Sequence, residues 1–177
     1  MTTFPSDTDH LAYARSLIRT IEDYPKPGVQ FRDITPLLAD GVAMRSVAQA
    51  LVAQADTEFD VVAGVEARGF IFAGAAATVA GTGMIPIRKH GKLPMAAHQV
   101  SYAKEYGHDA LEVSPELEPG MRVLLLDDIL ATGGTLKAGA ELVEHAGAEV
   151  VSVGVLMELQ GLGGRTIMPQ TKALFCI

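Results

Sequence analysis

The segment VLLLDDILATGGTLKAG, from Val123 to Gly139, decides the fold. It opens with a run of branched apolar residues, which is typical of a strand that is buried on both faces of a sheet. Two aspartates, Asp127 and Asp128, then precede a small glycine-rich turn, and the residues from Thr135 onward follow the spacing of an amphipathic helix. The segment therefore predicts a strand, a tight loop and a helix, which is the unit from which parallel sheets are built.

The rest of the chain repeats this alternation of apolar runs and helical patterns. The expected strands are 59–65, 84–89, 122–128, 149–159 and 171–177, and the expected helices are 9–22, 44–55, 70–80 and 135–148. We therefore expect an α/β fold, doubly wound, with a mainly parallel central sheet flanked by helices. Residues 90–119 are polar and too long for an ordinary connection, so they are predicted to form a flexible flap or an extra hairpin over the C-terminal strand ends.

Composition excludes several classes of protein. The net charge of -7 and the isoelectric point near 5.1 argue against a nucleic-acid partner, which would need clustered lysine and arginine. Cys176 is the only cysteine, so no internal disulfide is possible, and no apolar run approaches the roughly 18 residues of a membrane span. We expect a cytoplasmic protein without a membrane partner. The spacing of His90, His98 and His108 matches no common zinc pattern, which favours solvated loop histidines.

The loop after the central strand has the composition of an anion site. Ligands of open α/β sheets bind at the carboxyl ends of the strands, and backbone N–H groups at a helix N-terminus attract phosphate. Glycines let a phosphate approach the backbone, and threonine hydroxyls add donors. The residues expected to hold a phosphate are Ala131, Thr132, Gly133, Gly134 and Thr135.

The adjacent aspartates indicate a second part of the same ligand. Carboxylates repel phosphate but accept hydrogen bonds from sugar hydroxyls or from magnesium-bound water. A ribose 5-phosphate, with its hydroxyls on Asp127 and Asp128, would satisfy both features. The alternative is a plain strand end and helix cap without a ligand. An acidic pocket of a phosphoryl-accepting receiver domain would require further acids at the end of an N-terminal strand, where the chain has none.

Two basic loops follow other strands of the expected sheet. Arg68, in EARGF, would present a permanently charged fork to a second anion such as pyrophosphate, unless it pairs with a surface acid. Arg88, Lys89 and Lys92 cluster after the strand 84–89 in an otherwise acidic chain. A solvated charged loop is the alternative for that cluster.

VLLLDDILATGGT resembles the phosphoribosyl pyrophosphate signature of the type I phosphoribosyltransferases, and the similarity extends over nearly the whole chain to their adenine-specific branch. YPKPGVQFRDITPLL, VAGVEARGFIFAG, IPIRKHGKLP, EYG and VLMEL occur in that order and spacing. The resemblance implies a single domain over 1–177, with an N-terminal helix and base-binding hood over 1–40 and the flap over 90–119. It also implies that the EARGF loop binds pyrophosphate through Glu66, Ala67 and Arg68, with a cis peptide at Glu66–Ala67, assisted by Arg88, Lys89 and Lys92.

The resemblance also assigns the adenine side. Phe31 and Leu159 would sandwich the base, while the backbone around Gln30 and Arg32 would read its edge; from the sequence alone, a core phenylalanine under the loop is equally compatible with Phe31. Glu105 would be the general acid, with a pKa raised by flap closure, and Tyr106 would help close the site. Solvation is the alternative for Glu105.

The expected catalytic residues are thus Glu105, Asp127, Asp128 and Arg68, acting with Mg²⁺ that is held through the donor pyrophosphate and water rather than by a firm protein ligand. The implied reaction is transfer of 5-phosphoribosyl from phosphoribosyl pyrophosphate to adenine in purine salvage, giving AMP and pyrophosphate, by a homodimer. A transferase for hypoxanthine or guanine, or a regulator that senses phosphoribosyl pyrophosphate, are the alternatives.

Overall fold

The computed structural model describes residues 7–103 and 108–177, and the chain divides into two compact units, Met1–Gln49 and Ala50–Ile177. The segment 1–40, expected to carry the N-terminal helix and hood, falls within the first unit. That unit contains α1 (Asp7–Ser16), β1 (Arg19–Ile21), β2 (Phe31–Asp33), α2 (Thr35–Ala39) and most of α3 (Gly41–Ala53).

The helix predicted over 9–22 is wrong beyond Ser16. Residues Arg19–Ile21 instead form β1, which pairs antiparallel with β2 and places Ile21 opposite Phe31. The apolar residues at 17, 18 and 21 match the helical period, but that period competes with a hairpin whose strands satisfy each other's backbone groups. An ion pair of 2.5 Å between Arg19 and Asp33 reinforces the strand pairing.

The second unit is built on a seven-stranded sheet in the order β5-β6-β4-β3-β7-β8-β9, and it confirms the α/β prediction. Its five central and C-terminal strands run parallel, whereas β6 and β5 run antiparallel at one edge. The strands are β3 (Val61–Val65), β4 (Gly83–Lys89), β5 (His98–Ala103), β6 (His108–Val113), β7 (Arg122–Leu130), β8 (Glu149–Glu158) and β9 (Lys172–Cys176). The apolar runs correctly predicted every parallel strand, because these strands are covered on both faces.

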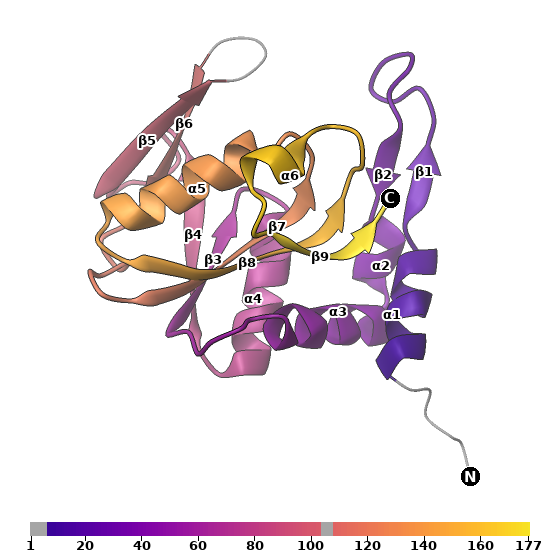
Figure 1. Ribbon diagram of the computed structural model, residues 1–177, viewed down its shortest axis with the longest axis horizontal. Helices are drawn as coiled ribbons and strands as arrows, with labels where there is room; N and C mark the ends of the chain where they lie inside the picture. Colours follow the sequence, from indigo (N-terminus) through magenta and orange to yellow (C-terminus); the bar gives the residue numbers. More distant parts are fainter. Residues whose placement is uncertain (1–6, 104–107) are drawn as a thin grey trace. The chain divides into compact units, whose positions relative to one another are not determined.

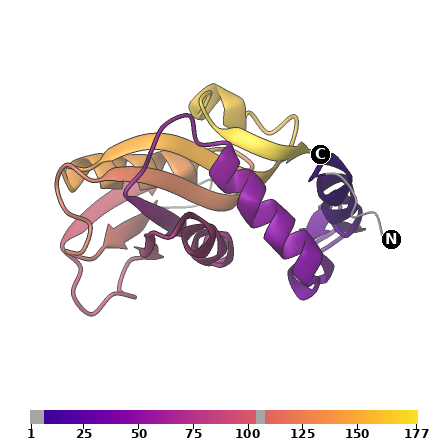
Figure 2. The ribbon, with the colours of Figure 1, turned by 90° about the horizontal axis from the view of Figure 1, so that it is seen from below.

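Helices α4 (Gly69–Ala80) and α5 (Gly134–His145) cover opposite faces of this sheet (Figures 1 and 2). Successive strand residues point to opposite faces. A Cβ on Gly64 would lie 2.6 Å from the side chain of Ala73 in α4, whereas Gly139 of α5 faces Val65. The glycine at 64 therefore lets the small-residue helix α4 approach the strands closely, and α5 closes the main apolar core on the other face.

The polar segment 90–119 contains the antiparallel hairpin of β5 and β6, which extends from the β4 edge (Figure 1). The hairpin alternative for this segment is therefore confirmed. Residues 104–107, which include Glu105 and Tyr106, lie outside the described residues. Across the ranges 7–103 and 108–177, none of the helices has both the length and the apolar character that a membrane crossing requires.

Candidate functional site

Strand β7 carries both aspartates inside the sheet rather than at its end. It continues to Leu130, two residues beyond the expected 122–128, and Asp127 pairs in register with Val155 of β8. The connection to α5 is therefore only Ala131, Thr132 and Gly133. This tight connection places the aspartates directly against the first turn of the following helix.

A small cavity of about 90 Å³ lies between Asp127 and the start of α5. Liquid water occupies roughly 30 Å³ per molecule, so the cavity has room for about three waters or one small anion. Among the described residues, α5 has no side chain that caps its N-terminus, which leaves its first N–H groups available to a ligand. The cavity is lined by Asp127, Ile129, Ala131, Thr132, Gly133, Thr135 and Leu136.

The two aspartates face different partners. Asp127 lines the small cavity, and its Oδ1 accepts a hydrogen bond of 2.8 Å from the backbone N–H of Asp128. The carboxylate of Asp128 forms an ion pair of 2.5 Å with Arg68, the residue that precedes α4. Gly69, the first residue of α4, approaches Asp127 so closely that a Cβ there would lie 2.9 Å from Oδ1. The site thus joins the N-termini of two helices around two acids.

Burial sets the electrostatics of the pair. Asp127 and Asp128 are 7% and 5% exposed. Desolvation and the neighbouring charge of Asp128 raise the pKa of Asp127 well above its usual range. Desolvation also raises the pKa of Asp128, against the opposing effect of the Arg68 guanidinium. The pair therefore carries one negative charge more readily than two, and hydroxyl donors from a ligand would stabilise the second charge.

Glu66 ties the EARGF loop to the basic cluster. Its carboxylate accepts a hydrogen bond of 2.9 Å from the backbone N–H of Lys89 and faces the Arg88 guanidinium at 3.3 Å. Burial raises the pKa of Glu66, but these partners outweigh it and leave the pKa below its usual value. The Glu66–Ala67 peptide is cis, as the resemblance implied. Glu66 therefore connects the loop that carries Arg68 to the end of β4, which carries Arg88.

Glu112 is a structural residue of the site that sequence reasoning missed. It is 3% exposed on β6, and its Oε1 accepts hydrogen bonds of 2.8 Å from the backbone N–H groups of Lys92 and Leu93. Burial raises the pKa of Glu112, whereas these backbone donors and those of the same loop lower it to a net value below normal. Glu112 thus shapes the loop that carries Lys92. The sequence offered no local signal for this role, because the N–H groups that Glu112 binds are 19 and 20 residues away.

The residues predicted to contact adenine are divided between the two units. Phe31 is half-buried in the N-terminal hairpin and packs edge-on against Tyr24, with ring centroids 5.2 Å apart. The Arg32 guanidinium donates to Gln30 and to Thr20. Leu159, at the end of β8 in the second unit, is also half-buried. The pairing of Phe31 with Leu159 around a base stays a prediction, as do the roles of Glu105 and Tyr106.

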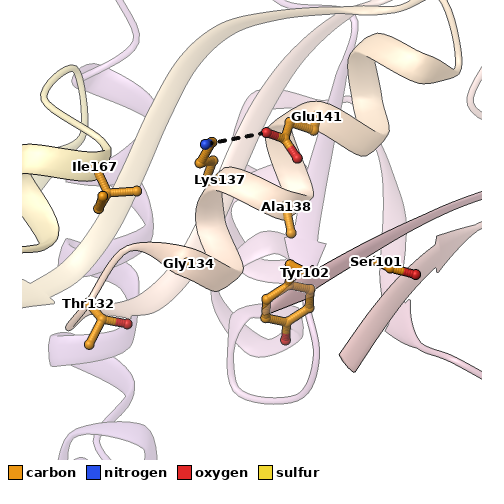
Figure 3. Close-up of a pocket in the computed structure, with 8 residues that line it drawn as sticks. All are labelled: Ser101, Tyr102, Thr132, Gly134, Lys137, Ala138, Glu141 and Ile167. Atoms are coloured by element: carbon orange, nitrogen blue, oxygen red, sulfur yellow. Dashed lines mark ion pairs between the residues drawn. The ribbon is translucent and has the colours of Figure 1, made fainter. Parts of the chain in front are cut away.

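A larger cavity of about 440 Å³ borders the glycine-rich loop (Figure 3). Thr132 and Gly134 form one side, and Tyr102 of β5 lies across from the first turns of α5. Lys137 and Glu141 form an ion pair of 3.7 Å on its rim. The hairpin therefore provides a wall next to the glycine-rich loop. Within the described residues, no group of three or more His, Cys, Asp or Glu side chains could hold a metal ion.

Comparison with known proteins agrees with this geometry. The phosphoribosyl transferase domain family matches residues 34–176. The adenine phosphoribosyltransferase of Clavibacter michiganensis is 57% identical over 152 residues, which cover 85% of this chain and 86% of the relative. The crystal structure of adenine phosphoribosyltransferase from Thermoanaerobacter pseudethanolicus has a TM-score of 0.88 at 41% identity, covering 94% of this chain and 99% of the other.

A second solved structure shares the fold and carries ligands. The adenine phosphoribosyltransferase of Saccharomyces cerevisiae, complexed with D-2,5-dideoxy-2,5-imino-altritol 1,6-bisphosphate and adenine, has a TM-score of 0.86 at 30% identity and covers 94% of this chain and 97% of its own. The family match spans most of the chain, and the relatives align over nearly their full length. The chain therefore belongs to the phosphoribosyltransferase family and, within it, to the adenine phosphoribosyltransferases.

Proposed function

We propose that this protein transfers the 5-phosphoribosyl group from 5-phosphoribosyl 1-pyrophosphate to N9 of adenine, giving AMP and pyrophosphate in purine salvage. The observation that carries the proposal is the small cavity at the start of α5, where Asp127 meets Thr132, Gly133 and Thr135. It combines a site for a monophosphate with acceptors for sugar hydroxyls. The yeast relative, whose crystals contain a sugar bisphosphate analogue and adenine, supports the same pair of ligands.

The donor would bind along β7 and α5. Its 5-phosphate would accept hydrogen bonds from the first N–H groups of α5 and from Thr132 and Thr135. Its ribose hydroxyls would donate to Asp127 and Asp128. Arg68 already contacts Asp128 at 2.5 Å, and its five N–H donors allow it to hold a pyrophosphate oxygen as well. The pyrophosphate would thus lie next to the ribose hydroxyls, which is the order of groups in the donor molecule.

The chemistry requires the C1–O bond to pyrophosphate to break and a bond from adenine N9 to C1 to form, with loss of the N9 proton. Positive charge develops on the ribose as the leaving group departs with the bonding electrons. The buried carboxylates of Asp127 and Asp128 would stabilise that charge, and Arg68, Arg88 and Lys89 would stabilise the pyrophosphate. Glu66 would act by orienting Arg88 and Lys89, since a carboxylate is not an anion ligand.

Four finer points remain part of the proposal. Mg²⁺, when bound with the donor, would neutralise pyrophosphate charge. Asp127 and Asp128 would accept hydrogen bonds from its water ligands. Phe31 and Leu159 would contact the adenine ring, and Glu105 would exchange a proton with the base. We also expect a homodimer in the cytoplasm, in line with the family resemblance.

An assay of the purified protein with the donor, Mg²⁺ and one base at a time tests the proposal. We expect AMP from adenine at a kcat/KM at least about 100-fold above those for hypoxanthine and guanine, because a site that hydrogen-bonds one base edge leaves polar groups unpaired with another. Preference for hypoxanthine or guanine would favour the other-base alternative. Absence of any nucleotide product, with retained donor binding, would favour the sensor alternative.

A further inference from the structure

Helix α6 (Gly164–Ile167) backs the phosphate loop, which we define as residues 131–135. A Cβ on Gly164 would overlap the carbonyl oxygen of Ala131 and lie 2.8 Å from the side chain of Leu130. In the other direction, a Cβ on Gly133 would lie 3.0 Å from both the carbonyl oxygen of Gly164 and Cβ of Ile167. Two glycines thus permit direct backbone contact between α6 and the phosphate loop (Figure 1). We therefore expect a displacement of α6 to shift the phosphate loop as well.

A helix of four residues does not hold its own position, since one turn fixes more backbone freedom than its hydrogen bonds return. Apolar support for α6 is confined to its carboxyl end: Met168, directly after the helix, is 3% exposed within the main core, whereas Leu162 and Ile167 are 51% and 46% exposed. Gly163, which precedes α6, has a φ of 77°, so the chain also reverses direction there. Met168 anchors the carboxyl end of α6, and we expect polar contacts to fix the rest of its position.

Arg165 supplies those contacts. Its Nε and Nη2 each lie 2.8 Å from Oε2 of Glu158, the last residue of β8, and its Nη1 donates to the carbonyl oxygens of Thr171 and Pro169. Glu158 is itself fixed, because it pairs with Leu130 of β7 and its carbonyl oxygen accepts from the N–H of Ile177 at 3.0 Å. The guanidinium therefore joins α6 to the end of β8 and to the connection that leads into β9.

We propose that Arg165 is a positioning residue for the phosphate loop: it clamps α6 against residues 131–133 and thereby fixes the N–H groups that hold the 5-phosphate. This inference rests on the proposed function, in which that loop binds the phosphate of the donor. Arginine suits the task because its planar fork reaches a carboxylate and two carbonyl oxygens at once, whereas a lysine ammonium cannot span all three.

The decisive test measures the binding of ribose 5-phosphate, a probe without base or pyrophosphate, by titration calorimetry. In Arg165→Met, we expect the Kd for ribose 5-phosphate and the KM for the donor to rise about 10-fold or more, since small misplacements of a binding group are costly. The KM for adenine should change less than about 2-fold, because the backbone N–H of Leu159 remains bonded to Leu130 at 2.9 Å. Arg165→Lys should raise the Kd for ribose 5-phosphate about 3-fold, because a lysine can replace only one of the contacts of Arg165.

The matched control is Arg122→Met. Arg122 is 40% exposed against 43% for Arg165, and it also clamps acids at the end of a strand, but at the amino end of β7. This control should lose stability and keep its ribose 5-phosphate affinity.

A folded Arg165→Met variant with wild-type affinity for ribose 5-phosphate would overturn the inference while leaving the proposed function intact. So would an equal loss in Arg122→Met. If Arg165→Met does not fold, wild-type affinity in Arg165→Lys overturns it. Failure of the wild-type protein to bind ribose 5-phosphate would remove the proposed function itself.

Discussion

Charged residues are exposed and ion-paired at one end of β7, whereas near the other end two acids are buried next to each other. At the amino end, Arg122 donates to both carboxylate oxygens of Asp60, at 3.1 and 2.8 Å, and faces Glu58 at 3.4 Å. All three side chains are at the surface. Towards the carboxyl end, Asp127 and Asp128 are buried side by side, and the Arg68 guanidinium lies 2.5 Å from the carboxylate of Asp128. At the amino end, acids are paired with an arginine at the surface. Near the carboxyl end, two acids of the same charge are adjacent in the interior.

The pKa values follow this difference. Hydrogen bonds from Arg122 lower the pKa of Asp60 to about 2. Burial, together with the charge of Asp128, raises the pKa of Asp127 well above normal. A paired surface acid supports the fold, whereas two buried adjacent acids oppose it, and such a cost is typical of residues kept for function. The contrast distinguishes Asp60, an acid that supports the fold, from Asp127 and Asp128, the acids that we propose to bind the ligand.

The largest expected effect comes from neutralising each end in turn. The double variant Asp127→Asn with Asp128→Asn should lower kcat/KM by about 10³-fold, because donors replace acceptors where hydroxyls and developing positive charge are bound. Asp60→Asn should change kcat/KM less than about 2-fold, since it lies at the far end of the strand. Initial rates of AMP formation measure both. Near wild-type rates in the double variant would contradict the proposal that Asp127 and Asp128 act in catalysis whereas Asp60 does not.

A smaller effect on activity is expected from alanine substitutions at two glycines near the two ends of β7. Gly133, in the phosphate loop, and Gly120, before β7, have the same φ of 84°. Alanine at either position carries a similar backbone cost of about 1–2 kcal/mol. Only at 133 would the new Cβ also press on α6, because nothing lies within 4 Å at 120. We expect Gly133→Ala to raise the KM for the donor about 30-fold. Gly120→Ala should lower the melting temperature without that change.

The smallest effect is on the pH dependence of stability. The folded pKa of Asp127 is raised, so between its unfolded value of about 3.9 and the folded value the native state binds more protons, and stability falls as pH rises. Asp127→Asn should therefore gain stability over the wild type as pH increases, by about 1 kcal/mol or more at pH 7.

Asp60 should behave oppositely. Its folded pKa is depressed to about 2, so its stabilisation is present above pH 4 and lost as pH falls towards 2. Urea midpoints of Asp127→Asn, Asp60→Asn and the wild type at several pH values test both signs. A gap between Asp127→Asn and the wild type that is constant across pH would contradict the account.

Local patterns predicted the features that depend on local chemistry. Parallel strands buried on both faces produce continuous apolar runs, so β3, β4, β7, β8 and β9 could be found from the sequence. The loop at 131–133 was recognisable because a phosphate site at a helix N-terminus requires small residues in consecutive positions. The strand end was misplaced by two residues, since aspartates are rare inside strands and suggested a boundary.

Features that depend on contacts distant in sequence escaped prediction. Glu112 bonds to N–H groups 19 and 20 residues away, and nothing local marks it as a loop anchor. Helix α6 is too short to produce a periodic sequence pattern. The need for a glycine at 164 is evident only in the folded chain, where the backbone of Ala131 lies against it. The predicted end of the first helix was wrong because Ile21 fits the helical period as well as a strand. Its pairing with Phe31, ten residues later, decides in favour of the strand.

The most direct test of the central claim is a crystal structure with 5-phosphoribosyl 1-pyrophosphate and Mg²⁺ bound. The account predicts the 5-phosphate within hydrogen-bonding distance of the backbone N–H groups of residues 132–135, the ribose hydroxyls on Asp127 and Asp128, and the pyrophosphate beside Arg68. Donor bound elsewhere, with the loop at 131–135 free of phosphate, would contradict it.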